Sequence, residues 1–206
     1  MVIGGHSRNV GKTSVVAGLI AALPERSWTA IKITQYGHGI CSRDGQPCGC
    51  AVDGQEHSFA ITEETDRSGG SDTSRFLLAG ARRVLWVRTR QGFLAEAMPG
   101  LRHELEGASD AIVESNSLLR YLRPDLYIAV LDPANPDFKS SAREALNRAD
   151  ALILDLPPEG ALEIAPVWQG ISLKPASGKP VFRVRPPQYV TAEVADFVRK
   201  RIVVSR

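Results

Sequence analysis

The feature that most constrains this chain is a glycine-rich segment near its start, Gly4-Gly5-His6-Ser7-Arg8-Asn9-Val10-Gly11-Lys12-Thr13-Ser14. It directly follows a short apolar run at 1–4 and directly precedes a stripe of apolar residues at helical spacing over 12–23, which Pro24 ends. A strand, a turn ending in Gly-Lys-Thr and a helix are the context of the Walker A motif, or P-loop. This order predicts an α/β fold with the loop at the carboxyl end of a strand.

The residue types of this segment suit phosphate binding. Glycine at position 11 lets the backbone approach an anion closely, and consecutive N–H groups at a helix N-terminus converge on it. Lys12 reaches the β- and γ-phosphates and is the expected catalytic cation, while the Thr13 hydroxyl is placed to ligate Mg²⁺. The expected nucleotide-binding residues are Asn9, Val10, Gly11, Lys12, Thr13 and Ser14. One departure stands out, because His6 occupies the position of the first motif glycine and Gly5 comes one residue early.

Further apolar runs alternate with helical patterns along the chain. The expected strands lie at 1–4, 29–33, 84–87, 111–113, 126–131, 151–154 and 181–184. Several are apolar at nearly every position, which is typical of parallel strands covered on both faces. We therefore expect one P-loop NTPase domain over 1–206, a doubly wound, mostly parallel sheet with helices on both faces.

Local signals refine this arrangement. Ser141-Ala142-Arg143-Glu144 has the form of a capping box that opens a helix, and 191–201 reads as a basic-ended helix. Pro99 divides the pattern at 92–105 into two expected short helices. A Cys-rich loop is expected at 35–58, and a Pro-rich excursion at 157–187 around the last strand.

Composition narrows the class of protein. Of the 206 residues 43% are hydrophobic, and 25 basic residues nearly balance 23 acidic ones. This balance argues against a dominant nucleic-acid surface, and no apolar run is long enough to cross a membrane. The first residues lack the basic start and the apolar stretch of a signal peptide, so a cytoplasmic location is expected.

A P-loop is usually accompanied by a carboxylate at the end of another central strand. Glu114, at the end of the run 110–114, is the favoured residue for the Mg²⁺ shell or the attacking water, and we group it with Lys12 as catalytic. Asp132 and Asp155 also follow apolar runs, at the edge where ligands bind open α/β sheets. For these two the favoured interpretation is that each caps the following turn.

The three cysteines lie within ten residues, as Cys41, Cys48 and Cys50. Thiolates with an imidazole from His57, or alternatively His38, could hold Zn²⁺ or an iron–sulfur cluster. The spacing differs from the common C-x₂-C pairs. Free thiols or an occasional disulfide are therefore the alternative interpretation, and an odd number of cysteines argues against a disulfide framework.

Four segments resemble the molybdopterin-guanine dinucleotide biosynthesis protein B (MobB) family. They are the P-loop itself, Ala30-Ile31-Lys32-Ile33, the stretch from His57 through Ser68-Gly69-Gly70-Ser71-Asp72-Thr73-Ser74-Arg75 to Ala79-Gly80-Ala81, and Val113-Glu114. Together they span about 1–155. Ser71 stands where the family has a lysine, and no Asn-Lys-x-Asp guanine-reading motif is present. The base is therefore left open between guanine and adenine.

The resemblance implies a role in molybdenum-cofactor biosynthesis, with GTP as the nucleotide, Mg²⁺ as its cofactor and slow hydrolysis at best. It also implies a second ligand facing Lys32, Asp72 and Arg75, a guanylyltransferase or molybdenum enzyme as partner, and a homodimer. Two other classes use the same loop. One is an ATP-dependent small-molecule kinase or a ligase similar to dethiobiotin synthetase, and the other is a metallochaperone GTPase.

Overall fold

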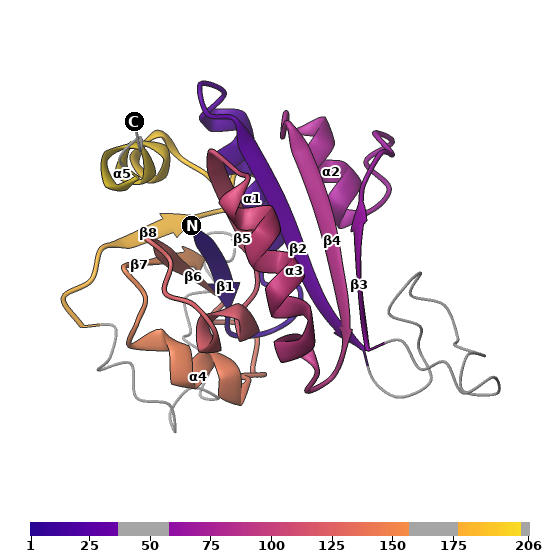
Figure 1. The fold of residues 1–206 in the computed structure, drawn as a ribbon. Helices are drawn as coiled ribbons and strands as arrows, with labels where there is room; N and C mark the ends of the chain where they lie inside the picture. Colours follow the sequence, from indigo (N-terminus) through magenta and orange to yellow (C-terminus); the bar gives the residue numbers. More distant parts are fainter. Residues whose placement is uncertain (37–57, 157–176, 203–206) are drawn as a thin grey trace. The chain divides into compact units, whose positions relative to one another are not determined.

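The computed structural model describes residues 1–36, 58–156 and 177–202 (Figure 1), which fall into two compact units. Unit 1 comprises residues 1–24 together with the chain from Arg123 onward. Its four strands pair in parallel in the order β1-β6-β7-β8. The elements of unit 1 are β1 (Val2–Gly5), α1 (Lys12–Ala22), β6 (Tyr127–Leu131), α4 (Ser140–Leu146), β7 (Ala151–Asp155), β8 (Val181–Val184) and α5 (Ala192–Arg201).

Unit 2 comprises residues 25–122, and its four strands pair in the order β3-β4-β2-β5. Among the described strands of unit 2, β3 pairs with β4 in the antiparallel direction, and the other two pairings are parallel. The elements of unit 2 are β2 (Trp28–Tyr36), β3 (Phe59–Glu63), α2 (Asp72–Leu78), β4 (Arg83–Arg90), α3 (Leu94–Glu106), β5 (Asp110–Glu114) and a short 3-10 helix at Ser117–Arg120.

The predicted class, an α/β fold with a mostly parallel sheet, is confirmed in both units. Strands β1 and β6 are buried along their whole length, as expected for strands covered on both faces. In unit 1, α4 lies on one side of β6–β8 and α5 on the other (Figure 1). In unit 2, the chain passes from β3 through α2 to β4 and then through α3 to β5, so each of these two helices connects strands of the sheet.

Two helix predictions are wrong. Ser141 does not cap α4, because the helix already begins at Ser140, with Lys139 as its N-cap residue and no side-chain cap. Pro99 does not divide its segment, since α3 is one helix over 13 residues. The exposed proline removes a single backbone donor, and its neighbours Met98 and Leu101 remain buried, which holds the helix together.

The edges of the expected loops also need correction. Strand β2 extends to Tyr36, so Gln35 and Tyr36 belong to the sheet rather than to the Cys-rich loop. Strand β3 was not expected from the sequence. It is a half-exposed edge strand, and its polar and apolar residues do not alternate in the way that predicts a strand. None of the helices in the described part of the chain is long and apolar enough to cross a lipid bilayer.

Candidate functional site

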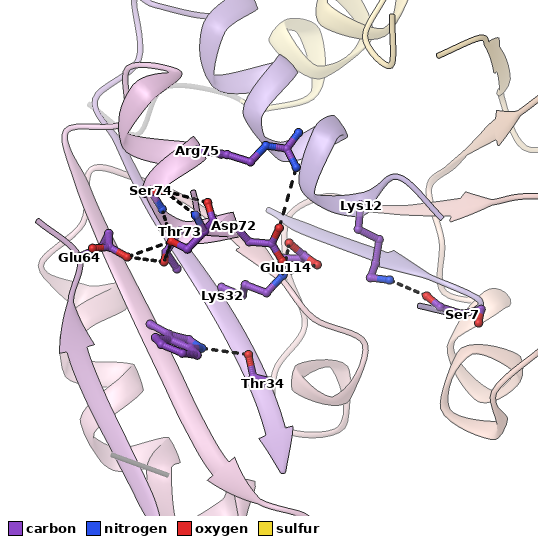
Figure 2. A network of polar contacts seen from close by, with 12 residues as sticks. Ser7, Lys12, Lys32, Thr34, Glu64, Asp72, Thr73, Ser74, Arg75 and Glu114 are labelled. Carbon is purple, nitrogen blue, oxygen red and sulfur yellow. Dashed lines mark hydrogen bonds and ion pairs between the residues drawn. The ribbon is translucent and has the colours of Figure 1, made fainter. Parts of the chain in front are cut away.

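The β1–α1 loop, residues 6–11, leaves the carboxyl end of β1 and turns directly into α1. Two of its residues adopt left-handed conformations, Asn9 with φ 58° and Gly11 with φ 85°. Gly11 is the N-cap residue of α1, and no side chain caps the helix start. Lys12 folds back across the loop and donates a hydrogen bond from Nζ to the backbone carbonyl of Ser7 at 2.6 Å (Figure 2). The loop therefore ends in a left-handed glycine at the helix start, and the ammonium group of Lys12 is held on the backbone of the loop.

Gly5, the early glycine of the motif, has a packing role beneath this loop. A Cβ atom at Gly5 would lie 2.8 Å from Cγ2 of Val10 and 2.9 Å from Cγ of Lys12. Val10 is fully buried, so its side chain anchors the loop to the core. Absence of a side chain at position 5 lets the valine and the aliphatic part of the lysine lie against the strand end.

His6, the residue that replaces the motif glycine, is fully buried and turned toward the segment after β6. Its Nδ1 accepts a hydrogen bond from the backbone N–H of Asp132 at 3.4 Å. The proton is therefore on Nε2, which lies 3.3 Å from the carbonyl oxygen of Asn135. Burial lowers the pKa of His6, and the neighbouring carbonyl groups oppose this shift only in part. A neutral, hydrogen-bonded imidazole thus joins the loop to the chain after β6.

Further bonds hold these two segments together. Ser7 donates from Oγ to the carboxylate of Asp137 at 2.7 Å, and the backbone N–H of Lys139 donates to the carbonyl of His6 at 2.9 Å. Sequence reasoning missed this connection, because the residues involved lie about 130 positions apart. The histidine in place of the motif glycine, followed directly by Ser7, is the sequence signal that could have indicated it.

The two acidic residues named as alternatives to Glu114 lie at the ends of adjacent strands in unit 1. Asp132 accepts a hydrogen bond from the backbone N–H of Ala134 at 2.9 Å, so it caps the turn that follows β6. Asp155 ends β7, and burial together with the nearby charge of Asp132 raises its pKa to about 6.

In unit 2, three of the expected site residues come together (Figure 2). Lys32 on β2 and Glu114 on β5 are register partners, and Lys32 Nζ lies 3.2 Å from both carboxylate oxygens of Glu114. Lys32 also forms an ion pair with Asp72 at the first position of α2. The side chains of Lys32 and Glu114 are 17% and 7% exposed, whereas that of Asp72 is 44% exposed. The lysine is thus held between a buried and an accessible carboxylate.

The start of α2 fixes the accessible carboxylate. Ser71 is the N-cap residue of α2. Its Oγ accepts from the backbone N–H of Ser74 at 3.0 Å, and Ser74 Oγ accepts from the backbone N–H of Ser71 at 2.9 Å. Arg75 lies 3.9 Å from Asp72 across one helical turn. Hydrogen bonds from Thr73 at 2.6 Å and from nearby backbone N–H groups lower the pKa of Glu64, although burial opposes the shift. Glu64 and the capping box therefore position Asp72 toward Lys32.

The two predicted metal sites both stay predictions. Thr13 lies in the first turn of α1 and offers a hydroxyl oxygen, a hard donor of the kind that Mg²⁺ binds. Cys41, Cys48, Cys50, His38 and His57 lie outside the described residues. Within 1–36, 58–156 and 177–202 no group of three or more His, Cys, Asp or Glu side chains could hold a metal ion.

The chain is similar in fold to two solved structures. LpxK from Aquifex aeolicus, in complex with ATP, is 19% identical with a TM-score of 0.46, covering 88% of this chain and 52% of that chain. HypB from Helicobacter pylori, in complex with nickel, is 15% identical with a TM-score of 0.45, covering 97% and 83%. The chain thus spans about half the length of LpxK. No protein-family model matches the sequence, and no curated protein matches it either.

Proposed function

We propose that the β1–α1 loop and the first turn of α1 bind the triphosphate of a nucleoside triphosphate. The observation that carries the proposal is the left-handed Gly11 directly before α1, with Lys12 folded across the loop onto the carbonyl of Ser7. A phosphate oxygen carries more negative charge than a carbonyl oxygen, so a bound triphosphate would take over the ammonium group. The N–H groups at the start of the helix would donate to the same anion.

Thr13 would hold Mg²⁺ through its hydroxyl oxygen, together with oxygens of the bound phosphates. When bound, the ion would neutralise charge on the β- and γ-phosphates. Lys12 would orient the terminal phosphates, and the buried Val10 would keep the loop in one shape between binding events. Glu114 belongs to unit 2, and its proposed role toward the metal shell or attacking water rests on sequence position.

The finer assignment follows from the resemblance to the MobB family. We propose GTP as the nucleotide, slow hydrolysis, and a role in molybdenum-cofactor biosynthesis in the cytoplasm with a guanylyltransferase or molybdenum enzyme as partner. In unit 2, Lys32, Asp72 and Arg75 are proposed to face a second ligand. The accessible side chains of Asp72 and Arg75 support this, because an anionic ligand could replace the contact between Lys32 and Asp72.

Calorimetric titration with GTP and ATP in the presence of Mg²⁺ tests the proposal. We expect Lys12→Ala to weaken triphosphate binding on the order of 10- to 100-fold, which is the loss typical of a hydrogen bond to a charged group. Lys200→Ala is the matched control, since Lys200 is exposed near the end of α5. Equal affinity in the two variants, or no binding of either nucleotide to the wild type, would contradict the proposal. Tighter binding of GTP than of ATP would support the finer assignment.

A further inference from the structure

A short segment between β8 and α5 lies against the start of α1. After β8 the chain makes a turn in which the backbone N–H of Gln188 donates to the carbonyl of Arg185 at 2.9 Å. Tyr189 and Val190 follow, and Thr191 then caps α5 by accepting from the N–H of Val194 at 3.4 Å. Tyr189 and Val190 are therefore fixed between a turn and a helix start.

Both residues of this segment contact α1 where that helix and its N-cap have glycine. A Cβ atom at Gly11 would lie 2.3 Å from Cε1 and 2.8 Å from Cδ1 of Tyr189. A Cβ atom at Gly18 would lie 2.7 Å from Cγ2 of Val190. The tyrosine ring thus lies directly on the backbone of Gly11, the N-cap residue of α1 within the proposed phosphate site.

We propose that the ring of Tyr189 forms the wall against which the nucleoside part of the bound triphosphate stacks. This inference rests on the proposed function and identifies a residue that recognises the part of the ligand beyond its phosphates. In a nucleoside triphosphate a ribose joins the base to the α-phosphate, so the base lies beside the end of the phosphate site that holds the α-phosphate. Gly11 borders the proposed phosphate site, and the ring of Tyr189 covers it there, so we place the base on this side of the site.

Two further observations support a ligand contact rather than a purely structural one. Strands β1, β6, β7 and β8 are all parallel to one another. The chain therefore leaves β8 at the same edge of the sheet at which it leaves β1. Tyr189 is also only half-buried, unlike Tyr127, which is 2% exposed in the core. A flat aromatic surface at the ligand-binding edge of an α/β sheet suits a nucleobase, since every base has a face that can stack.

The binding of a nucleotide and of inorganic tripolyphosphate, each measured with Mg²⁺, shows whether the ring of Tyr189 contacts the nucleoside or only packs against Gly11. We expect Tyr189→Leu to weaken binding of GTP or ATP about ten-fold, as loss of one stacking contact does, and to leave tripolyphosphate binding unchanged. Tyr189→Phe keeps the ring and should bind both ligands like the wild type. Tyr121→Leu is the matched control, because Tyr121 is a half-buried tyrosine of unit 2.

The outcomes separate this inference from the proposed function. If Tyr189→Leu weakens tripolyphosphate and nucleotide equally, or changes neither, the ring is a packing element and the inference is wrong. A wild type that binds neither ligand overturns the proposed function and the inference with it. A wild type that binds both, with a Tyr189→Leu defect confined to the nucleotide, supports both.

A second variant gives a direct optical readout that does not depend on Tyr189→Leu folding. In Tyr189→Trp the indole would stack on the base, so its fluorescence should fall when GTP or ATP binds and stay constant with tripolyphosphate. The same titrations of the wild type subtract the response of its own three tryptophans. Equal fluorescence changes with nucleotide and tripolyphosphate would overturn the inference.

Discussion

The ammonium group of Lys32 lies 3.2 Å from each carboxylate oxygen of Glu114, and the two residues are register partners on β2 and β5. Both side chains are shielded from water, at 17% and 7% exposure. An ion pair of this kind adds little net stability, but removal of one partner leaves a buried charge without its counterion. The buried carboxylate of Glu114 therefore requires a positively charged side chain at position 32.

Lys32→Met should for this reason lower the free energy of unfolding by about 3 kcal/mol. The matched change Arg83→Met removes a cation whose side chain is 38% exposed and should cost no more than about 1 kcal/mol. Urea unfolding of both variants measures the difference. Equal losses would show that burial does not determine the cost, and the double variant Lys32→Met with Glu114→Gln should recover part of the stability.

Gly11→Ala tests the backbone of the proposed phosphate site. Alanine at φ 85° is strained, and its Cβ atom would overlap the ring of Tyr189, so we expect a loss of about 2 to 4 kcal/mol in the free energy of unfolding. Gly80→Ala isolates the backbone contribution, because Gly80 has φ 106° and nothing within 4 Å of a Cβ atom. That control should cost about 1 kcal/mol. Similar losses in the two variants, measured by thermal or urea unfolding, would argue against the ring contact.

The sequence allowed much of the fold to be predicted, because buried parallel strands such as β1 and β6 are continuously apolar and α1 has an unbroken apolar stripe. The edge strand β3 escaped prediction since its polar and apolar residues do not alternate cleanly. Pro99 misled for a different reason. The prediction considered only the backbone hydrogen bond that a proline removes from a helix. In the structure, α3 is stabilised by burial of its apolar side chains Leu94, Ala97, Met98 and Leu101.

The candidate site was predictable only where its chemistry is local in sequence. The Gly-Lys-Thr run and the lysine at position 32 each carry their own signal. Contacts of His6 with Asp132 and of Gly11 with Tyr189 join residues more than 120 positions apart, and no spacing rule connects them. From the sequence alone, a histidine in place of the motif glycine only weakens the match to the P-loop motif. The fold shows that His6 makes hydrogen bonds with the chain that follows β6.

The buried imidazole of His6 makes a pH dependence testable. Burial lowers its folded pKa below the ordinary 6.5, so the unfolded chain takes up this proton first as the pH falls. Protonation of the unfolded chain at His6 therefore lowers the free energy of unfolding as the pH falls through about 6.5. His6→Gln should reduce the difference in free energy of unfolding between pH 7.5 and pH 6. His103→Gln, on the exposed face of α3, serves as control and should leave the difference as it is in the wild type.

Asp155 should act in the opposite direction. Its folded pKa of about 6, against an ordinary 3.8, means that between these values the folded chain holds a proton that the unfolded chain has lost. Its contribution to stability therefore falls as the pH rises through this window and stays low above it. Asp155→Asn should raise the free energy of unfolding at pH 7.5 by about 1 kcal/mol, a figure reduced for partial exposure to solvent, and by much less at pH 4. Asp125→Asn, at an exposed position before β6, should change neither value. Urea unfolding at the two pH values decides the matter, because an equal gain at both, or a loss at pH 7.5, would mean that the carboxylate of Asp155 is not disfavoured by Asp132 and burial.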